Sequence, residues 1–122
     1  MTDAGSYRES ARAHEVVTFG ALTVTSEREG AVHTICLSGE LDLATADVVN
    51  DELMRAEGDD ASSIVLDLSG LTFIDSTGLR LLVTAAARSR ADSDRLALLR
   101  GGPAVQRAFA LTGLEAHLPF AD

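Results

Sequence analysis

The sequence contains no lysine, so all ten of its basic residues are arginines. Without lysine the chain cannot carry the Gly-Lys-Ser/Thr ending of a Walker-type phosphate loop, which excludes that class of nucleotide site. The ten arginines are outnumbered by 19 acidic residues, which gives a formal net charge of −9 at pH 7. Proteins that bind nucleic acid need a clustered positive surface, so we expect no nucleic-acid partner.

Cysteine and long apolar runs are scarce as well. Cys36 is the only cysteine, so no intramolecular disulfide can form. The N-terminus shows no charged-then-apolar signal segment, and no apolar run approaches the length of a membrane span. We therefore expect a cytoplasmic protein with no membrane partner. Because His14, His33 and His117 show no metal-ligand spacing, we also expect no metal and no other cofactor.

Length and composition point to a single packed domain. A chain of 122 residues is long enough for one core and too short for two ordinary ones. Apolar residues make up 46% of the sequence but aromatic residues only 4%, so the core must consist mainly of Leu, Val, Ile and Ala. This composition is typical of a compact α/β protein.

The N-terminal region divides into an extension and the start of the domain. Residues 1–18 are mostly small and polar with no sustained apolar period, which predicts a loose extension before a domain over residues 19–122. We expect removal of this extension to leave the fold nearly as stable. Two β-rich stretches, 21–26 and 31–38, flank a charged turn at 27–30 and predict a hairpin.

After the hairpin the apolar period changes to that of a helix. Ala46, Val49, Leu53 and Ala56 recur at helical spacing, with Asp42 or Thr45 as the candidate N-cap and Gly58 as the end. The apolar run IVLDL at 64–68 then predicts a strand buried on both faces, followed by a turn at Ser69-Gly70.

The C-terminal half predicts two further helices and one further strand. An apolar stripe predicts a helix over 76–90, a strand follows over 95–99, and Pro103 begins a third helix that Gly113 ends. Residues 115–120 are either a last short strand or an irregular tail. The predicted order is ββαβαβα, and the βαβ passages imply parallel pairing. The fold class is therefore α/β, with a mixed sheet, an N-terminal hairpin plus parallel strands, packed against helices.

The motif Asp75-Ser76-Thr77-Gly78 lies between a strand and a helix and allows several functions. Asp or Ser immediately before a helix is a good N-cap, worth about 1 kcal/mol. A cap does not require Gly78 in the first turn, where glycine costs roughly 0.5–1 kcal/mol relative to alanine. We interpret Gly78 as a device that keeps the surface beside the Ser76 hydroxyl low, so that another molecule can approach it.

A serine hydrolase is the enzymatic alternative for Ser76. The nucleophile elbow of α/β-hydrolases places glycine two residues before the serine, but this chain has Ile74 there. The only histidine downstream is His117, in a tail without a recognisable motif. Catalysis by Ser76 therefore lacks both its motif and an anchored base, and we predict that the chain has no catalytic residue.

Four segments together resemble the STAS domain of bacterial anti-sigma factor antagonists. They are GELD at 39–42, IVLDL at 64–68, LTFIDSTGL at 71–79 and AFALTGL at 108–114, and the resemblance covers about residues 20–120. It implies a STAS-like domain, a mixed sheet backed by helices, and a serine at the start of the second helix that a partner phosphorylates. By position, that serine is Ser76.

The resemblance also implies a partner-switching function. In this family the unphosphorylated protein binds an anti-sigma factor that is an ATP-dependent serine kinase, which releases the sigma factor. A phosphoserine phosphatase reverses the modification. We expect the partner-binding surface to combine the 39–45 loop with the start of the second helix, and it comprises Asp42, Thr45, Asp75, Ser76, Thr77 and Gly78.

Two other functions remain open at this point. The family also includes interaction modules of stress-sensing assemblies and of lipid-transport complexes, in which Ser76 would be only a helix cap. The serine hydrolase is the third hypothesis.

Overall fold

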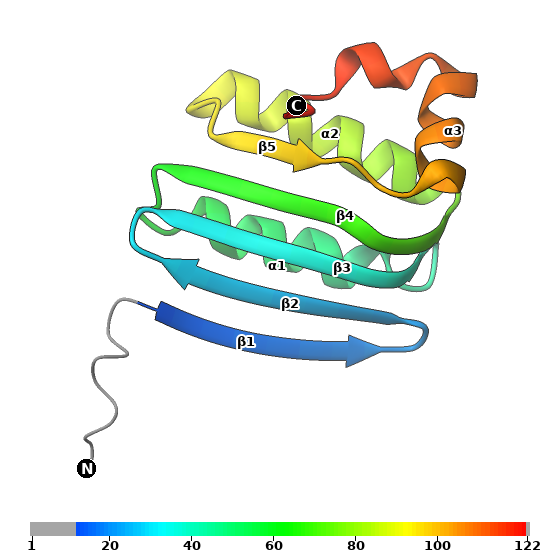
Figure 1. The fold of residues 1–122 in the computed structure, drawn as a ribbon. Coiled ribbons are helices and arrows are strands. Elements are labelled where there is room, and N and C mark those ends of the chain that lie inside the picture. Colours follow the sequence, from blue (N-terminus) through cyan, green and yellow to red (C-terminus); the bar gives the residue numbers. More distant parts are fainter. Residues whose placement is uncertain (1–11, 122) are drawn as a thin grey trace.

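The computed structural model describes residues 12–121 and arranges them as a mixed β-sheet with helices (Figure 1). The strands are β1 (Arg12–Phe19), β2 (Leu22–Glu29), β3 (Val32–Leu41), β4 (Ser63–Ile74) and β5 (Leu96–Leu99). The helices are α1 (Ala46–Glu57), α2 (Ser76–Asp92) and α3 (Pro103–Thr112), followed by the 3-10 helix η3 (Leu114–His117).

The strands lie in the sheet in the order in which they occur in the chain, β1-β2-β3-β4-β5. The first three pair antiparallel, whereas β3, β4 and β5 pair parallel. This confirms the predicted mixed sheet of a hairpin joined to parallel strands. The predicted order ββαβαβα is confirmed from β2 onward, and β1 adds a fifth strand in front of it.

Both antiparallel connections are two-residue turns with the sequence Gly-Ala. Gly20-Ala21 joins β1 to β2, and Gly30-Ala31 joins β2 to β3. The φ angles of Gly20 and Gly30 are 59° and 61°, while neither alanine has a positive φ. This is the pattern of a type II′ turn, whose twist matches that of the flanking strands. The glycines therefore permit the two tight reversals.

The helices α1 and α2 cover one face of the sheet (Figure 1). The crossovers β3-α1-β4 and β4-α2-β5 both step to the next strand in the same direction. Because such crossovers are right-handed, both helices must fall on the same side. The third helix, α3, packs against β4 and η3. Among residues 12–121, no helix combines the length and the apolar character that crossing a bilayer requires.

The core fills the space between the sheet and the helices. Ile35 of β3, Leu66 of β4 and Leu98 of β5 are fully buried at neighbouring positions of the three parallel strands. Phe109 meets Phe120 edge to face, with ring centroids 5.4 Å apart. The helices add further fully or almost fully buried apolar residues, namely Val49, Leu53, Ala56, Leu82, Ala85, Ala86 and Val105.

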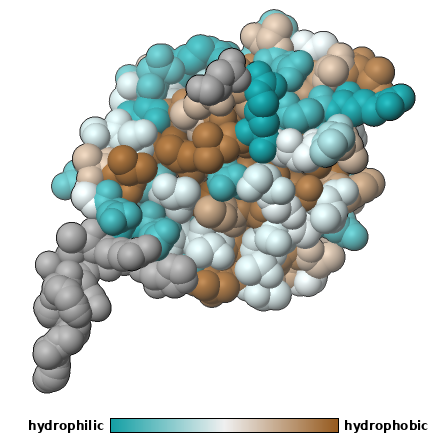
Figure 2. All heavy atoms as spheres, viewed as in Figure 1, coloured by the Kyte–Doolittle hydropathy of each residue, from teal (hydrophilic) through white to brown (hydrophobic). Residues whose placement is uncertain are grey.

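The opposite face of the sheet carries no helix, and Figure 2 shows it from outside. Its centre is pale or brown rather than teal, because weakly polar and apolar residues gather there. Half-buried side chains on this face include Thr23, Thr25, Thr34, Cys36 and Val65. Threonine and valine suit a pleated surface that is buried on one side only.

The prediction of a loose extension over residues 1–18 is wrong for residues 12–18. These residues belong to β1, which begins at Arg12 and pairs with β2 along its whole length. The strand was missed because it is an edge strand, and both Val16 and Val17 are exposed, so no alternation marks a buried face. Removing residues 1–18 would delete nearly all of β1 and uncover β2. The expectation that this truncation is harmless is therefore withdrawn, and residues 1–11 lie outside the described part.

Two predicted turns are also corrected. The turn predicted at residues 27–30 is misplaced, because Glu27 and Arg28 belong to β2 and pair with β3. The chain reverses at Gly30-Ala31 instead. At Ser69-Gly70 there is no turn, because β4 continues to Ile74 through an irregularity in its register with β3. A Cβ on Gly70 would lie 2.8 Å from the carbonyl oxygen of Leu37, so glycine allows the two backbones to approach.

The three predicted helices are confirmed. Thr45 is the N-cap residue of α1 and Gly58 its C-cap, and α2 begins at Ser76. Pro103 stands at the start of α3, and Gly113 ends it with a φ of 76°. The C-terminal tail forms η3 and a single parallel bridge between Phe120 and Leu98, so it is mostly irregular.

Candidate functional site

The 42–45 loop between β3 and α1 meets the junction of β4 and α2. Asp75 connects them, because one oxygen of its carboxylate accepts a hydrogen bond from the Gly78 amide at 3.0 Å. The other oxygen accepts from the Leu43 amide at 3.2 Å. The Asp75 amide also donates to the Leu41 carbonyl oxygen at 3.2 Å. The two βα connections named from the sequence therefore form one surface.

Asp75, not Ser76, is the N-cap of α2. Its backbone is extended, with φ −107° and ψ −174°, and its side chain binds the amide three residues ahead. Ser76 is consequently the first residue of the helix. Its side chain is exposed, and its hydroxyl makes no hydrogen bond within the described residues. The hypothesis that Ser76 serves only as a helix cap is therefore wrong.

Gly78 serves packing, and our interpretation that it lowers the surface beside Ser76 is wrong. The residue is buried. A Cβ there would lie 2.8 Å from side-chain carbons of both Leu41 and Ile74. Real Cβ contacts are almost never this short, so glycine lets the first turn of α2 rest on the ends of β3 and β4. Gly78 cannot contact a partner through this buried side.

Asp42 and Thr45 form the inside of the 42–45 loop. Asp42 Oδ1 accepts hydrogen bonds from the amides of Ala44 at 3.0 Å and Thr45 at 3.2 Å. The Thr45 hydroxyl donates to the Glu40 carbonyl oxygen and accepts from the Asp42 amide. Thr45 is only 2% exposed, so its side chain cannot touch a partner directly. Both residues therefore shape the loop that we predict from the sequence to be part of the partner-binding surface.

Leu43 is the residue that this loop presents outward, and the sequence analysis missed it. Its side chain is 77% exposed, although it is apolar. Hydrogen bonds hold the loop backbone on both sides of it. Leu43 lies on the same surface as the exposed Ser76, because Asp75, the residue before Ser76, holds the Leu43 amide, so Leu43 is a further candidate contact residue.

Thr77 lies on the α1 side of the same surface. It is half-buried and lines an open groove between the two helices. The groove is lined by Ala46, Asp47 and Asn50 of α1 and by Thr77, Arg80, Leu81 and Thr84 of α2. The predicted residues are thus neighbours, but only Ser76 is exposed; the others, which are half-buried or buried, are Asp42, Thr45, Asp75, Thr77 and Gly78.

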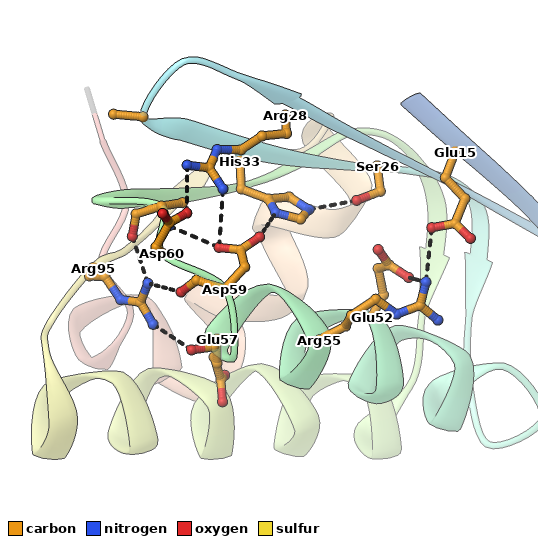
Figure 3. Close-up of polar contacts among 12 residues, drawn as sticks. Glu15, Ser26, Arg28, His33, Glu52, Arg55, Glu57, Asp59, Asp60 and Arg95 are labelled. Atoms are coloured by element: carbon orange, nitrogen blue, oxygen red, sulfur yellow. Dashed lines mark hydrogen bonds and ion pairs between the residues drawn. The ribbon is translucent and has the colours of Figure 1, made fainter. Parts of the chain in front are cut away.

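A second serine, Ser26, lies in a hydrogen-bonded chain beneath α1 (Figure 3). Ser26 Oγ lies 2.6 Å from His33 Nε2, and His33 Nδ1 lies 2.8 Å from Asp59 Oδ2. This connectivity is that of a catalytic Ser-His-Asp triad. However, Ser26 and His33 are only 6% and 8% exposed, so a substrate has no access to the hydroxyl. The chain of bonds satisfies polar groups inside the fold.

Two arginines extend this network around the connection between α1 and β4 (Figure 3). Arg28 lies 3.5 Å from Asp59 and 3.0 Å from Asp60. Arg95 donates to the carbonyl oxygens of Glu57 at 2.7 Å and Ala61 at 2.6 Å. Partial burial raises the pKa of Asp59, but its hydrogen bonds from Ala61 and His33 and the nearby positive charges outweigh this and lower the pKa below 3.8.

Glu52 of α1 is a buried acid near this network. It is 4% exposed, and its Oε1 atom lies 3.6 Å from Arg55, which also binds Glu15 of β1 at 2.9 Å. Its Oε2 atom is buried without a hydrogen-bond partner. The ion pairs link α1 to the edge strand.

Cys36 is not a candidate nucleophile. Burial raises the pKa of its thiol above the ordinary value, and the charges of Asp67 and Glu27 raise it further. The thiolate is therefore disfavoured at neutral pH. In the part of the chain that the structure describes, no three His, Cys, Asp or Glu side chains come together as a metal site.

Ser76 is exposed at the start of α2, beside a loop that presents Leu43, on a mixed α/β sheet with helices on one face, and this arrangement suits a domain that other proteins bind. Residues 23–122 match the STAS domain family, and the chain belongs to that family. It is 28% identical over 95 residues to the anti-sigma-F factor antagonist RsfB of Mycobacterium tuberculosis, covering 78% of this chain and 77% of the relative. It is 30% identical over 102 residues to the anti-sigma F factor antagonist of Paenibacillus polymyxa, covering 83% and 87%.

Solved structures agree with this assignment. The crystal structure of an anti-sigma factor antagonist from Mycobacterium paratuberculosis matches with a TM-score of 0.65 at 25% identity, over 89% of this chain and 84% of that one. SpoIIAA of Bacillus shares the fold at 22% identity in its unphosphorylated and phosphorylated forms, with TM-scores of 0.61 and 0.56. These matches cover 90% of this chain and 89% and 92% of the SpoIIAA chains. The resemblance and the fold class drawn from the sequence are confirmed.

Proposed function

We propose that this chain is an anti-sigma factor antagonist that phosphorylation of Ser76 switches off. The unphosphorylated protein binds an anti-sigma factor and so releases a sigma factor. The observation that carries this proposal is the Ser76 hydroxyl, which is exposed, has no hydrogen-bond partner among the described residues, and stands at the first position of α2. Relatives that are anti-sigma factor antagonists support the same reading.

The modifying enzyme must come from outside the chain. No described side chain is hydrogen-bonded to the Ser76 hydroxyl, so the described residues supply no base for it. The partner is an anti-sigma factor with ATP-dependent serine kinase activity, which transfers the γ-phosphoryl group of ATP to Ser76 Oγ. The hydroxyl proton is released and ADP leaves. A phosphoserine phosphatase restores the hydroxyl, and we place the whole cycle in the cytoplasm.

Phosphorylation should alter binding without unfolding the protein. At the N-terminus of α2 a phosphate faces free backbone amides and the positive end of the helix dipole. It also adds nearly two negative charges beside Asp75. For a partner matched to the bare hydroxyl, one unfavourable charge pair at ~6 Å with an effective dielectric constant of ~20 costs roughly 3 kcal/mol, about a hundredfold in affinity.

The test is calorimetric titration of the cognate anti-sigma factor with four forms of the protein. Wild type and Ser76→Ala should bind alike, whereas phosphorylated wild type should bind about a hundredfold more weakly. Ser76→Asp should lose part of that affinity because it carries less charge. Ser69→Ala, which changes another exposed serine, is the control and should bind like wild type. Equal affinities for all forms would contradict the proposed switch.

The other interaction-module function makes a different prediction. A module that holds a fixed partner needs no modification of Ser76. Mass spectrometry of the protein from its own cells distinguishes the two, because a Ser76 that is never phosphorylated under any growth condition favours the fixed module.

A further inference from the structure

The Asp75 carboxylate holds two amides that belong to different elements. Gly78 is in the first turn of α2, and Leu43 is in the loop before α1. The other side-chain hydrogen bonds of that loop are internal, because Asp42 and Thr45 bind one another and the Glu40 carbonyl oxygen. Among the described residues, Asp75 therefore provides the side-chain link between the loop and α2.

The amide that Asp75 holds carries the exposed Leu43 side chain. At 77% exposure, packing does little to fix the position of this side chain. Its geometry depends instead on the backbone, which the bond to Asp75 fixes on one side and Asp42 on the other. Loss of the Asp75 bond would free the loop next to Leu43 while leaving its internal bonds intact.

A phosphate on Ser76 would compete with this carboxylate. The two groups would be on adjacent residues and carry the same sign of charge. Asp75 accepts a hydrogen bond from the Gly78 amide, and a phosphate on Ser76 would accept from amides of the same helical turn. A phosphate offers three acceptor oxygens and nearly twice the charge, so it is the stronger ligand for those amides. Repulsion then acts on Asp75, whose second oxygen holds only the exposed Leu43 amide.

We propose that Asp75 is the positioning residue that transmits phosphorylation of Ser76 to the 42–45 loop. The phosphate displaces the Asp75 carboxylate from the Leu43 amide, and the loop that presents Leu43 loses its fixed geometry. This inference rests on the proposed function, since it concerns regulation of the same site. It adds a second effect to direct repulsion of the partner, namely loss of a preorganised apolar contact.

The test uses Asp75→Ser, which separates the two hydrogen bonds. Serine caps helices about as well as aspartate, so the bond from Gly78 is kept. One hydroxyl oxygen cannot replace both carboxylate oxygens, so the bond from Leu43 is lost. Phosphoserine is introduced at position 76 by genetic encoding, in wild type and in Asp75→Ser, so that no kinase is required. Asp51→Ser removes an equal charge from an exposed position of α1 and is the control.

The readout is water exchange of the Leu43 amide measured by NMR, divided by that of the Ala44 amide. Ala44 is bonded to Asp42 and experiences nearly the same phosphate field, so the ratio removes the effect of charge on exchange. We expect phosphorylation of wild type to raise the ratio about tenfold or more, since a hydrogen bond to a charged acceptor is lost. Asp75→Ser should show this rise without phosphate, and Asp51→Ser should not.

If Asp75 transmits the effect of phosphorylation, the effects of phosphorylation and of Asp75→Ser on the exchange ratio should not add. If its role is merely structural, they should add. If Asp75 carries the signal, phosphorylation of Asp75→Ser should change the ratio by less than about twofold. A ratio that stays the same when wild type is phosphorylated would overturn the inference, as would an equal rise in both backgrounds. Neither result contradicts the proposed function, which fails if the anti-sigma factor binds phosphorylated and unphosphorylated wild type equally or if Ser76 is never phosphorylated in its own cells.

Discussion

Ser26 and Ser76 have opposite surroundings, and neither alone is sufficient for catalysis. Ser26 is bonded to His33, which is bonded to Asp59, but both Ser26 and His33 are buried. Ser76 is exposed at the start of α2, but its hydroxyl has no partner within residues 12–121. A serine nucleophile needs a base and access at the same atom. This chain provides them at two different serines.

The difference implies that stability and regulation depend on different residues of this small domain. The Ser26 network joins β2, β3 and the α1–β4 connection, so changes there should affect folding. Ser76 bonds to no side chain among the described residues, so a change there should affect only what binds. Four predictions test this division.

The largest expected effect is that of His33→Ala on stability. The substitution leaves the buried Ser26 hydroxyl and one Asp59 oxygen without their partner and creates a cavity. We expect a loss of roughly 3 kcal/mol, seen as a fall in Tm of more than about 10 °C in thermal unfolding. Ser76→Ala is the matched control and should stay within about 0.5 kcal/mol of wild type. Equal losses for both variants would remove the distinction between the two serines.

Gly78→Ala should destabilise the protein by about 1–3 kcal/mol in urea unfolding. The added Cβ would lie 2.8 Å from carbons of Leu41 and Ile74, so the first turn of α2 must shift. Gly58→Ala is the control, because its Cβ would meet nothing closer than 3.6 Å and its φ of −83° suits alanine. A neutral Gly78→Ala would restore our first interpretation, in which this glycine serves access to Ser76.

Asp59→Asn should cost roughly 1 kcal/mol at pH 7 and much less in acid. The folded-state pKa of Asp59 is lowered, so its stabilising contribution is present above pH 3.8 and is lost as the pH falls through the folded value. The stabilities of wild type and variant should therefore converge below pH 3.8 in denaturant titrations at several pH values. Asp60→Asn, at a side chain that is 93% exposed, should change little at any pH.

The smallest expected effect is that of a serine-reactive fluorophosphonate probe on the native protein. We expect no labelling of Ser26, because the probe cannot reach it, and none of Ser76, because no base among the described residues activates it. Mass spectrometry of the intact and digested protein measures both. Stoichiometric labelling of Ser26 would show that the triad opens to solvent and would revive the hydrolase hypothesis.

Most of the fold could be predicted because its helices and inner strands bury one regular face. Apolar residues recur at helical spacing from Ala46 to Ala56 and over 76–90. Pro103 marks the start of a helix, and Gly58 and Gly113 mark the ends of helices, as in the structure. The strand β1 could not be predicted in the same way, since an edge strand with two exposed valines shows no buried face.

The position of Ser76 could be predicted from the sequence, but the roles of its neighbours could not. Which of two adjacent residues caps α2, and which way Gly78 faces, depends on contacts with β3 and β4. Ser26, His33 and Asp59 were missed as a group because they lie 7 and 26 residues apart. A signal existed, since Ser26 continues the inward phase of Leu22 and Val24 on its strand.

The strand order has a consequence for how the chain folds. Each strand pairs only with the strands that precede or follow it in the sequence, so no strand has to be inserted between two others. The two N-terminal hairpins require only two-residue loops to close. On a ribosome, β1, β2 and β3 can therefore assemble before α1 is synthesised, and each later helix-strand pair adds to a single growing edge. Such sequential growth keeps the contact order low. It also means that no central strand stays unpaired while a later partner is synthesised.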